Sequence, residues 1–286
     1  GPETSGDIFC TRISRINPYY TKKGESVDNG WSDVETQQFL TQQYNKTLAY
    51  FATATPGKRW LDLGCGKWKK SYWEICRPSI LVGMDVDPVI IAQREQSKIP
   101  DNWITLWGDF RYKWNRISQA KHLEMSPKWF SQYGWNYVEE EQPFDYILLN
   151  QSLSFANQTK AKLNDLLSLI TSKSTTGSQL WIHYLNLDSA LLSKMDVGEK
   201  VQFPNQGYIH KRDDISINIY LPWSMESEIV EYPISEKRLT QYLHTLGWNK
   251  SSGHINIDHL VDTSPNLSNV WQNLYNSHEW SIYTKR

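Results

Sequence analysis

The sequence is poor in cysteine, with three in 286 residues, at positions 10, 65 and 76. An odd count, with ten residues between the last two, fits neither a disulfide framework nor a zinc motif. We therefore expect a reducing compartment and no metal site. The chain also lacks any run of about 18 apolar residues and does not open on a signal peptide, which predicts a cytoplasmic protein without a membrane partner. Its formal net charge of −1 does not indicate nucleic-acid binding, so such a role would depend on local basic patches.

A third glycine is missing from the turn that follows the first predicted strand, residues 59–63. The turn reads Gly64-Cys65-Gly66, but the dinucleotide motif G-x-G-x-x-G requires glycine where Lys69 stands. The two glycines still allow a ligand to approach the backbone closely. We interpret Cys65 as a small turn residue, because nothing nearby marks its thiol as activated. The pattern favours a nucleoside site over a dinucleotide site, and an ordinary strand–turn–helix junction is the alternative.

Two aspartates accompany this turn. Asp62 lies two residues before Gly64, and Asp85 follows the second predicted strand, residues 80–84. A carboxylate in the latter position can bind two ribose hydroxyls. With these aspartates, the sequence DLGCGK resembles motif I of the class I S-adenosylmethionine (SAM) methyltransferases. The resemblance implies SAM as the cofactor and S-adenosylhomocysteine as its product.

Predicted strands and helices alternate along most of the chain and end with a late strand pair, which favours an α/β fold. We expect a Rossmann-like class I methyltransferase fold, in which a mostly parallel seven-stranded sheet has helices on both faces. Residues 1–30 are interpreted as an N-terminal arm and residues 31–286 as a single domain, with insertions at about 110–142 and 198–233. The alternating isoleucines of the second insertion predict an antiparallel β ribbon.

The residues expected at the carboxyl ends of the later strands bear on the reaction. Asp109 is interpreted as an acceptor for an adenine amino group, with a simple turn residue as the alternative. Asn150-Gln151 lacks the Pro-Pro-aromatic sequence of enzymes that methylate exocyclic amino groups, and no Pro-Cys for cytosine C5 follows either. No lysine-centred set for a ribose hydroxyl can be assembled. We therefore expect an acceptor that is already nucleophilic, so that transfer depends on positioning and needs no catalytic side chain.

This acceptor class leads to a more specific resemblance, which runs from about residue 12 to the C-terminus. An arm at residues 15–22, DLGCGK, the aspartate after the second strand and a late VEYPIS carry it. They resemble the mRNA cap guanine-N7 methyltransferases, especially those in capping enzymes of large cytoplasmic DNA viruses, asfarvirus-like and more distantly poxvirus-like. The resemblance implies transfer from SAM to N7 of the cap guanine. It also implies the capped 5′ end of mRNA as a partner, and a larger capping enzyme around the domain.

The resemblance also assigns individual residues. Lys22 would reach the SAM carboxylate, although Lys23 aligns as easily, and Glu231 matches a glutamate that accepts the N1 and N2 hydrogens of guanine. Lys67 would approach the cap phosphates, and it begins a basic run that a solvated helix start also explains. The residues implied for SAM are Lys22, Asp62, Gly64, Cys65, Gly66, Asp85, Asp109, Asn150 and Gln151. The residues implied for the cap are Tyr19, Lys67, Phe155, Glu231, Tyr232 and Tyr283.

The chain departs from this family after the fourth strand. There the family has a His-Tyr-x-Phe cluster, whereas this chain has Ser152-Leu153-Ser154-Phe155, so that only Phe155 matches. The terminal tyrosine of the family is ambiguous too, because His278 and Tyr283 both fit. The isolated His183 and His210 are interpreted as packing or surface residues. The alternatives are a methyltransferase for another acceptor and a methyltransferase-like RNA-binding module without turnover. The intact motif I argues against the second.

Overall fold

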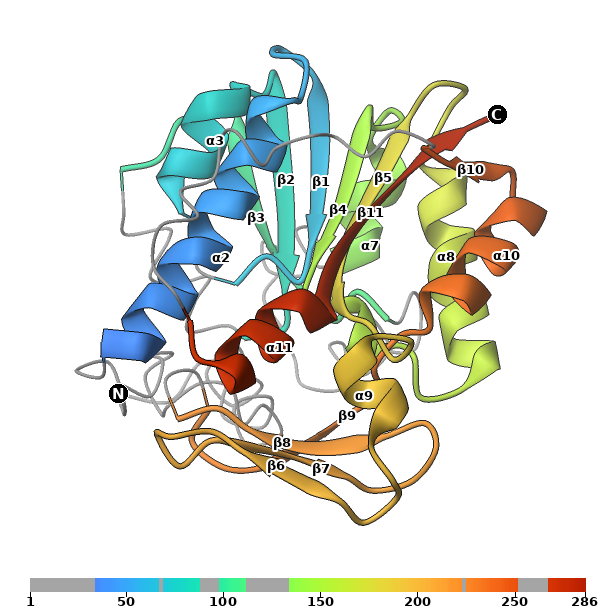
Figure 1. Cartoon of the computed structure of the whole chain (residues 1–286). Coiled ribbons are helices and arrows are strands. Elements are labelled where there is room, and N and C mark those ends of the chain that lie inside the picture. The colour runs from blue at the N-terminus through green and yellow to red at the C-terminus, as the bar shows by residue number, and fades with distance from the viewer. Residues whose placement is uncertain (1–33, 67–68, 88–97, 112–133, 223–224, 252–266) are drawn as a thin grey trace, which may run out of the picture.

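The computed structural model describes residues 34–66, 69–87, 98–111, 134–222, 225–251 and 267–286. Its main sheet has seven strands in the order β10-β11-β5-β4-β1-β2-β3 (Figure 1). The strands are β1 (Arg59–Leu63), β2 (Ile80–Asp85), β3 (Trp103–Trp107), β4 (Tyr146–Asn150), β5 (Gln179–Leu185), β10 (Trp248–Lys250) and β11 (His278–Lys285). Neighbouring strands pair in parallel, except that β11 runs antiparallel to both β5 and β10. The predicted mostly parallel seven-stranded sheet is confirmed.

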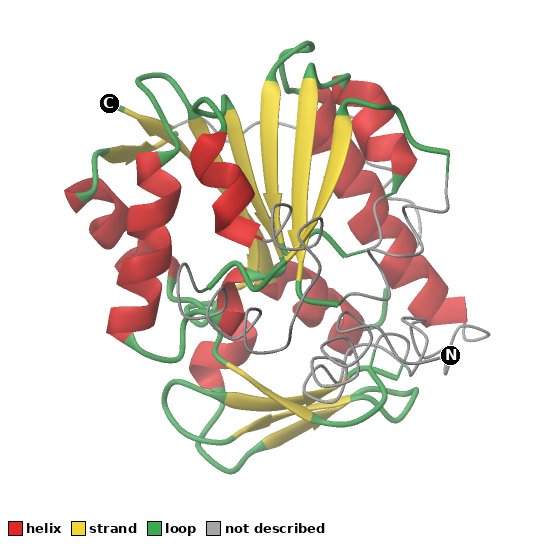
Figure 2. Ribbon diagram, turned by 180° about the vertical axis from the view of Figure 1, so that it is seen from behind, coloured by secondary structure: helices red, strands yellow, loops and turns green. Residues whose placement is uncertain are grey.

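Helices cover both faces of this sheet, as predicted (Figures 1 and 2). Side chains of α2 and α3 pack on one face, and side chains of α7, α8 and α10 pack on the other. The helices are α2 (Val34–Ala52), α3 (Lys70–Cys76), α7 (Gly134–Glu140), α8 (Lys160–Ser172), α9 (Ala190–Lys194), α10 (Glu236–Thr245) and α11 (Asn269–Ser277). Among the described helices, none is both long and apolar enough to span a bilayer.

Neighbouring residues of β1 face opposite sides of the sheet, and both sides are buried. Leu61 joins a mainly aliphatic core beneath α8 and α10, whereas Trp60 joins a core rich in aromatic residues beneath α2 and α3. Trp60 stacks on Tyr146 with 4.4 Å between ring centroids and meets Trp181 edge-on at 5.2 Å. Each such pair adds about 0.5–1.5 kcal/mol beyond the burial of its area. The centre of the sheet is therefore a rigid base for the residues at the strand ends.

The second insertion forms a separate four-stranded antiparallel sheet in the order β6-β7-β8-β9 (Figure 2). Its strands are β6 (Lys200–Gln202), β7 (Tyr208–Lys211), β8 (Ile217–Tyr220) and β9 (Ile229–Glu231). Alternate isoleucines, among them Ile209, Ile217 and Ile219, are buried against Phe39 of α2 and Trp271 of α11. The predicted antiparallel ribbon is thus confirmed, and it has four strands. Three or more strands with a buried apolar face are more stable in water than a two-stranded hairpin.

Some predicted elements differ from the structure. The sequence predicts a strand at 255–257, which lies outside the described residues, and misses β10, whose three residues are too few to show a periodic pattern. The first insertion contains α7. The sequence also predicts helices at 88–96 and near 126–133, and both lie outside the described residues, as does the N-terminal arm.

Candidate active site

The turn after β1 forms one side of the site. Gly64 and Gly66 have φ angles of 76° and 49°, in the left-handed region that favours glycine. The backbone N–H groups of Gly64 and Cys65 both donate to the carbonyl of Met84 on β2, at 2.8 and 3.0 Å. A Cβ atom on Gly64 would lie 2.5 Å from the Cβ atom of Ser152. The backbone conformation and the close packing therefore both require glycine here.

Ser152 joins the end of β4 to this turn. It precedes a short 3-10 segment, Leu153–Phe155, and its hydroxyl donates to the carbonyl of Leu63 at 2.7 Å. Because β1 lies between β2 and β4, the bond crosses the point where the strand order reverses, which is where α/β sheets bind ligands. Ser152 is only 3% exposed, so a histidine in its place, as in the His-Tyr-x-Phe cluster, would not fit without rearrangement.

The carboxylate of Asp85 is fixed beside the same turn. One oxygen accepts the N–H of Gly66 at 2.8 Å, and the other accepts the N–H of Asp87 at 2.9 Å. Asp85 is buried, and so is Asp62 on β1. Charge-assisted bonds of this kind orient a carboxylate before any ligand binds. The structure therefore brings Asp62, Gly64, Gly66 and Asp85 together, as the sequence predicts.

Asp109, after β3, is paired within the protein. Its two oxygens accept from Nε and Nη2 of Arg111 at 2.9 and 2.6 Å. Arg111 also donates to the carbonyl of Phe155 at 3.3 Å, and the Phe155 side chain packs against the hydrophobic core. Both carboxylate oxygens of Asp109 therefore face a guanidinium group. The adenine contact expected of Asp109 and the cap contact expected of Phe155 stay predictions.

A cavity of about 850 Å³ lies at the carboxyl ends of β4 and β5, and the turn residues Gly64 and Gly66 and the carboxylate of Asp85 do not line it. Its walls come from α2, the carboxyl ends of β4 and β5, the inner side of the second sheet and the start of β11. Asn150, Gln151 and Glu231, three of the residues singled out in the sequence, all line it. Pockets for organic ligands commonly enclose about 300–1,000 Å³. The second sheet therefore closes a ligand-sized space against the strand ends.

Glu231, the last residue of β9, brings an unpaired carboxylate to this cavity. Within the described part of the chain it makes no hydrogen bond or ion pair. Burial raises the pKa of Glu231 from its usual 4.5 to about 7. A half-buried carboxylate without a partner is costly, and such groups gather at functional sites.

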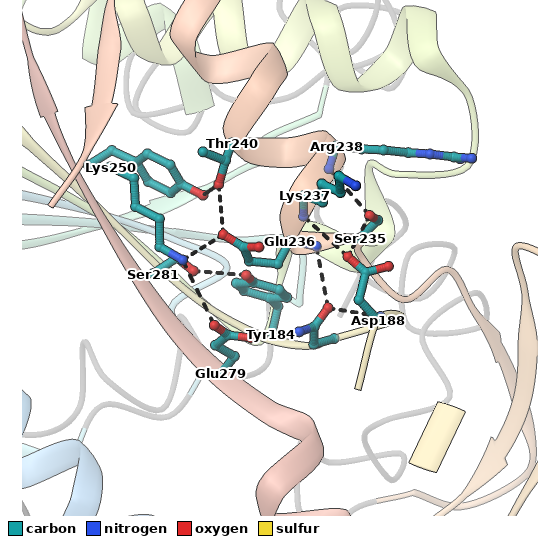
Figure 3. A network of polar contacts seen from close by, with 12 residues as sticks. Tyr184, Asp188, Ser235, Glu236, Lys237, Arg238, Thr240, Lys250, Glu279 and Ser281 are labelled. Carbon is teal, nitrogen blue, oxygen red and sulfur yellow. Dashed lines mark hydrogen bonds and ion pairs between the residues drawn. The ribbon is translucent and has the colours of Figure 1, made fainter. Parts of the chain in front are cut away.

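Glu231 is held in position by the segment that follows it. The N–H of Ile234 donates to the carbonyl of Leu185 at the end of β5, at 3.1 Å. Figure 3 shows the polar network around this junction, in which the Lys250 ammonium lies 2.6 Å from the carboxylate of Glu236 on α10. The start of α10 is thus fixed to the main sheet, and the end of β9 with it.

Two histidines also line the cavity. Nδ1 of His183 lies 2.8 Å from Oδ1 of Asn150, and the ring stacks on Trp280 with 4.4 Å between centroids. His278 donates from Nδ1 to the carbonyl of Leu274 at 2.9 Å, which leaves Nε2 as the unprotonated nitrogen of the neutral ring. Burial lowers the pKa of His278 to about 4, and burial with nearby positive groups holds the pKa of His183 well below 6.5. Both rings are therefore neutral near pH 7.

Sequence reasoning missed several residues of this cavity. His183 does pack on its neighbours, as predicted, but its place near the carboxyl end of a predicted strand was a signal for a site residue. Lys69 was not missed, because it belongs to the basic run predicted at this helix start; it lines the cavity with its ammonium 4.7 Å from the centre of the Tyr44 ring, and burial lowers its pKa. Gln43, from α2, lines it too. The residues of α2 gave no signal, because the helix precedes motif I and its pattern indicates only packing.

Other residues expected at the cap site lie elsewhere. Tyr283 is wholly buried in the core, where its hydroxyl lies 2.9 Å from Oγ1 of Thr240, and it does not line the cavity. Of the two candidates for the terminal family tyrosine, only His278 reaches the cavity. Tyr232 accepts a bond from Asn157 through its carbonyl at 3.3 Å and does not line the cavity either. Residues outside the described part of the chain are Tyr19, Lys22 and Lys67.

Comparisons with known proteins bear on the fold. No protein-family model matches the chain, and no curated protein matches it. A Listeria monocytogenes protein assigned as a SAM-dependent methyltransferase is similar, with 12% identity and a TM-score of 0.52, over 86% of this chain and 99% of that one. DesVI of Streptomyces venezuelae is similar with 9% identity and a TM-score of 0.50, over 89% and 98%. With the strand order, these likenesses show a class I SAM-dependent methyltransferase fold. Neither structure is described as a capping enzyme, so the resemblance to that family stays a prediction.

Proposed function

We propose that the chain is a SAM-dependent methyltransferase. The main support is Asp85, whose buried carboxylate is bonded to the N–H of Gly66 at the reversal point of a class I fold. These residues fit the cofactor, because the glycines leave the backbone open to a ligand and a carboxylate after β2 can accept ribose hydroxyls. When bound, SAM supplies a methyl group on a sulfonium centre, and the leaving group is a neutral thioether.

The contribution of the protein is binding and alignment. The cavity at the carboxyl ends of β4 and β5 would hold the acceptor and keep water away from it. Alignment of two reactants can contribute about 7–11 kcal/mol of the barrier. His183 and His278 are neutral near pH 7, and Glu231 is the acidic residue among the described residues that line the cavity. An acceptor atom that is already nucleophilic would need none of these groups as a general base.

We further propose N7 of the cap guanine as the acceptor. N7 has a lone pair at neutral pH, so its methylation needs no general base. Glu231 supports this acceptor, because a carboxylate can accept the N1 and N2 hydrogens on the opposite edge of guanine and leave N7 available. The capped 5′ end of mRNA would then be the partner, with the cap phosphates near the basic start of α3.

A small-molecule acceptor is the second candidate, and one observation favours it. Lys69 is the only lysine or arginine among the described residues that line the cavity, and burial lowers its pKa. A triphosphate bridge is commonly bound by several cationic side chains. A nitrogen nucleophile without phosphates would need none of them.

Calorimetric titration with SAM tests the cofactor assignment. Asp85→Asn keeps the size of the side chain but removes its charge. Hydrogen bonds to charged groups contribute about 1.5–3 kcal/mol, so we expect Kd to rise roughly 10- to 100-fold. Asp101→Asn, in an exposed turn, is the matched control and should bind like the wild type. Equal affinity of the two folded variants would contradict the cofactor assignment.

A further inference from the structure

Asn186 follows β5 and is bonded through its side chain to two other elements of the chain. Its Nδ2 atom donates to a carboxylate oxygen of Glu279 on β11 at 2.6 Å, and its Oδ1 atom accepts the N–H of Glu236 on α10 at 3.3 Å. Oδ1 also accepts the N–H of Asp188 at 3.0 Å. Asn186 is only 9% exposed and does not line the cavity itself. Its amide therefore lies behind the cavity wall, where three segments meet.

On one side, Asn186 holds the residues that flank His278 in the cavity wall. Glu279, which follows His278, accepts the bond from the Asn186 side chain. Ser277, which precedes His278, accepts the backbone N–H of Asn186 through its carbonyl at 2.8 Å. His278 therefore lines the cavity between two residues that are bonded to the same asparagine.

On the other side, the amide of Asn186 holds the segment that leads back to Glu231. The bond to the N–H of Glu236 fixes the start of α10. Between Glu231 and α10, the N–H of Ile234 donates to the carbonyl of Leu185 at 3.1 Å, one residue before the asparagine. The part of the wall that contains Glu231 is therefore attached to the same point of the main sheet.

An asparagine suits this place, because an amide donates and accepts at once. Aspartate would bring a second carboxylate against Glu279, and leucine would leave the N–H of Glu236 without this acceptor. The bond to Glu279 is charge-assisted, and such bonds are about twice as strong as bonds between neutral groups. The amide is thus a strong link between the start of α10 and the start of β11.

We infer that Asn186 is a positioning residue for methyl transfer, which fixes His278 and Glu231 relative to each other without touching the ligand. The inference rests on the proposed methyltransferase function and adds a residue that neither motif I nor the family resemblance indicates. The cofactor corner lies at β1 and β2, away from this link. We therefore expect Asn186 to affect the binding of the acceptor and not that of SAM.

Two substitutions of Glu279 test the link. Glu279→Ala removes the partner of the Asn186 amide, whereas Glu279→Gln keeps an oxygen that can accept the same bond. Both remove the charge that lies 3.9 Å from the Lys250 ammonium, so the difference between the variants reports the bond and not the charge. The Glu279 side chain is 37% exposed, so we expect both variants to fold.

The first readout is the pKa of His278, from an NMR titration of the protein without substrate, with the signal assigned by its absence in His278→Gln. Burial lowers this pKa to about 4, and the nearby charge of Lys46 lowers it further in wild type and variants alike. Loss of the link should admit water to the ring. We expect a pKa closer to 6.5 in Glu279→Ala and a pKa near 4 in Glu279→Gln.

The second readout is methyl transfer to GpppG-capped RNA. Glu279→Ala should have a KM for the cap roughly 3- to 10-fold above that of Glu279→Gln, the equivalent of one hydrogen bond, with the same Kd for SAM. Equal pKa values of His278, or equal KM values for a cap that the wild type methylates, would overturn the inference. A rise in the SAM Kd along with KM would overturn it too, because the whole site would then have loosened.

The two readouts separate this inference from the proposed function. If the wild type methylates no cap, the guanine acceptor is wrong, whereas the titration of His278 still shows whether the bond to Asn186 holds the wall. SAM binding by the same protein then tests the methyltransferase assignment by itself.

Discussion

Replacement of Glu231 by glutamine should stabilise the protein at alkaline pH. Burial raises the pKa of Glu231 from 4.5 to about 7, so the folded protein disfavours the ionised form. At about 1.36 kcal/mol per pKa unit, ionisation of Glu231 lowers the free energy of unfolding by about 3 kcal/mol. Below pH 4.5 the group is protonated in the folded and the unfolded protein, and this free energy is fully present. It is lost as the pH rises through about 7. Glutamine carries no charge, so the variant should escape this loss.

Urea denaturation at about pH 4.5 and about pH 8.5 measures the effect. We expect the free energy of unfolding of Glu231→Gln to exceed that of the wild type by up to about 3 kcal/mol at the higher pH and by less than about 0.5 kcal/mol at the lower. Solvent in the cavity screens the charge, so the first value is an upper limit. Glu226→Gln, an exposed control, should show no such pH dependence. A Glu231→Gln variant without any gain at the higher pH would refute the reasoning.

The same variant should transfer methyl groups less well. The amide replaces one acceptor oxygen with an NH₂ group, which would face the N–H groups of the ligand and raise KM for the capped RNA. Stability and activity are then opposed at this position, as is common where a binding site keeps a buried polar group without a partner. A stabilised variant with unchanged KM would show that Glu231 does not contact the acceptor.

Two further substitutions test the local packing. Gly64→Ala should lower the free energy of unfolding by roughly 2–4 kcal/mol, because its φ of 76° is strained for alanine and the new Cβ atom overlaps a neighbour. Gly57 has a φ of 77° but open space around it, so Gly57→Ala should lower the free energy of unfolding by only roughly 1–2 kcal/mol. Equal losses for the two variants in urea denaturation would show that the overlap at Gly64 contributes nothing. Tyr283→Phe removes the bond to Thr240 and should lose about 1 kcal/mol with methyl transfer unchanged. Loss of methyl transfer without a change in the free energy of unfolding would instead indicate that Tyr283 contacts the substrate.

The parts of the fold that the sequence predicts are those with local signals. Gly64 needs a positive φ, Asp85 ends a short apolar run, and the alternating isoleucines at 217 and 219 form a strand of the second sheet. The cofactor corner is local in the same sense, because its turn and its aspartate come from two successive strands. Periodicity and turn chemistry are enough to predict such features.

The cavity lined by Glu231 could not be predicted in this way. Gln43, Gln151, His183, Glu231 and His278 come from five segments that meet only when the second sheet folds over the strand ends. The family resemblance singled out Glu231 and left two residues open for the terminal position, of which only His278 lines the cavity. Tyr283 faces the core of the sheet, whereas His278 at the start of the same strand faces the cavity. The alternation along a strand is visible in a sequence, but which side meets a cavity depends on the tertiary structure.

The most direct test of the methyltransferase assignment is transfer of a labelled methyl group from SAM to GpppG-capped RNA, followed by digestion and identification of the labelled nucleoside. We predict N7-methylguanosine from the wild type and much less of it from Asp85→Asn. A protein that labels no acceptor and does not bind SAM would contradict the assignment.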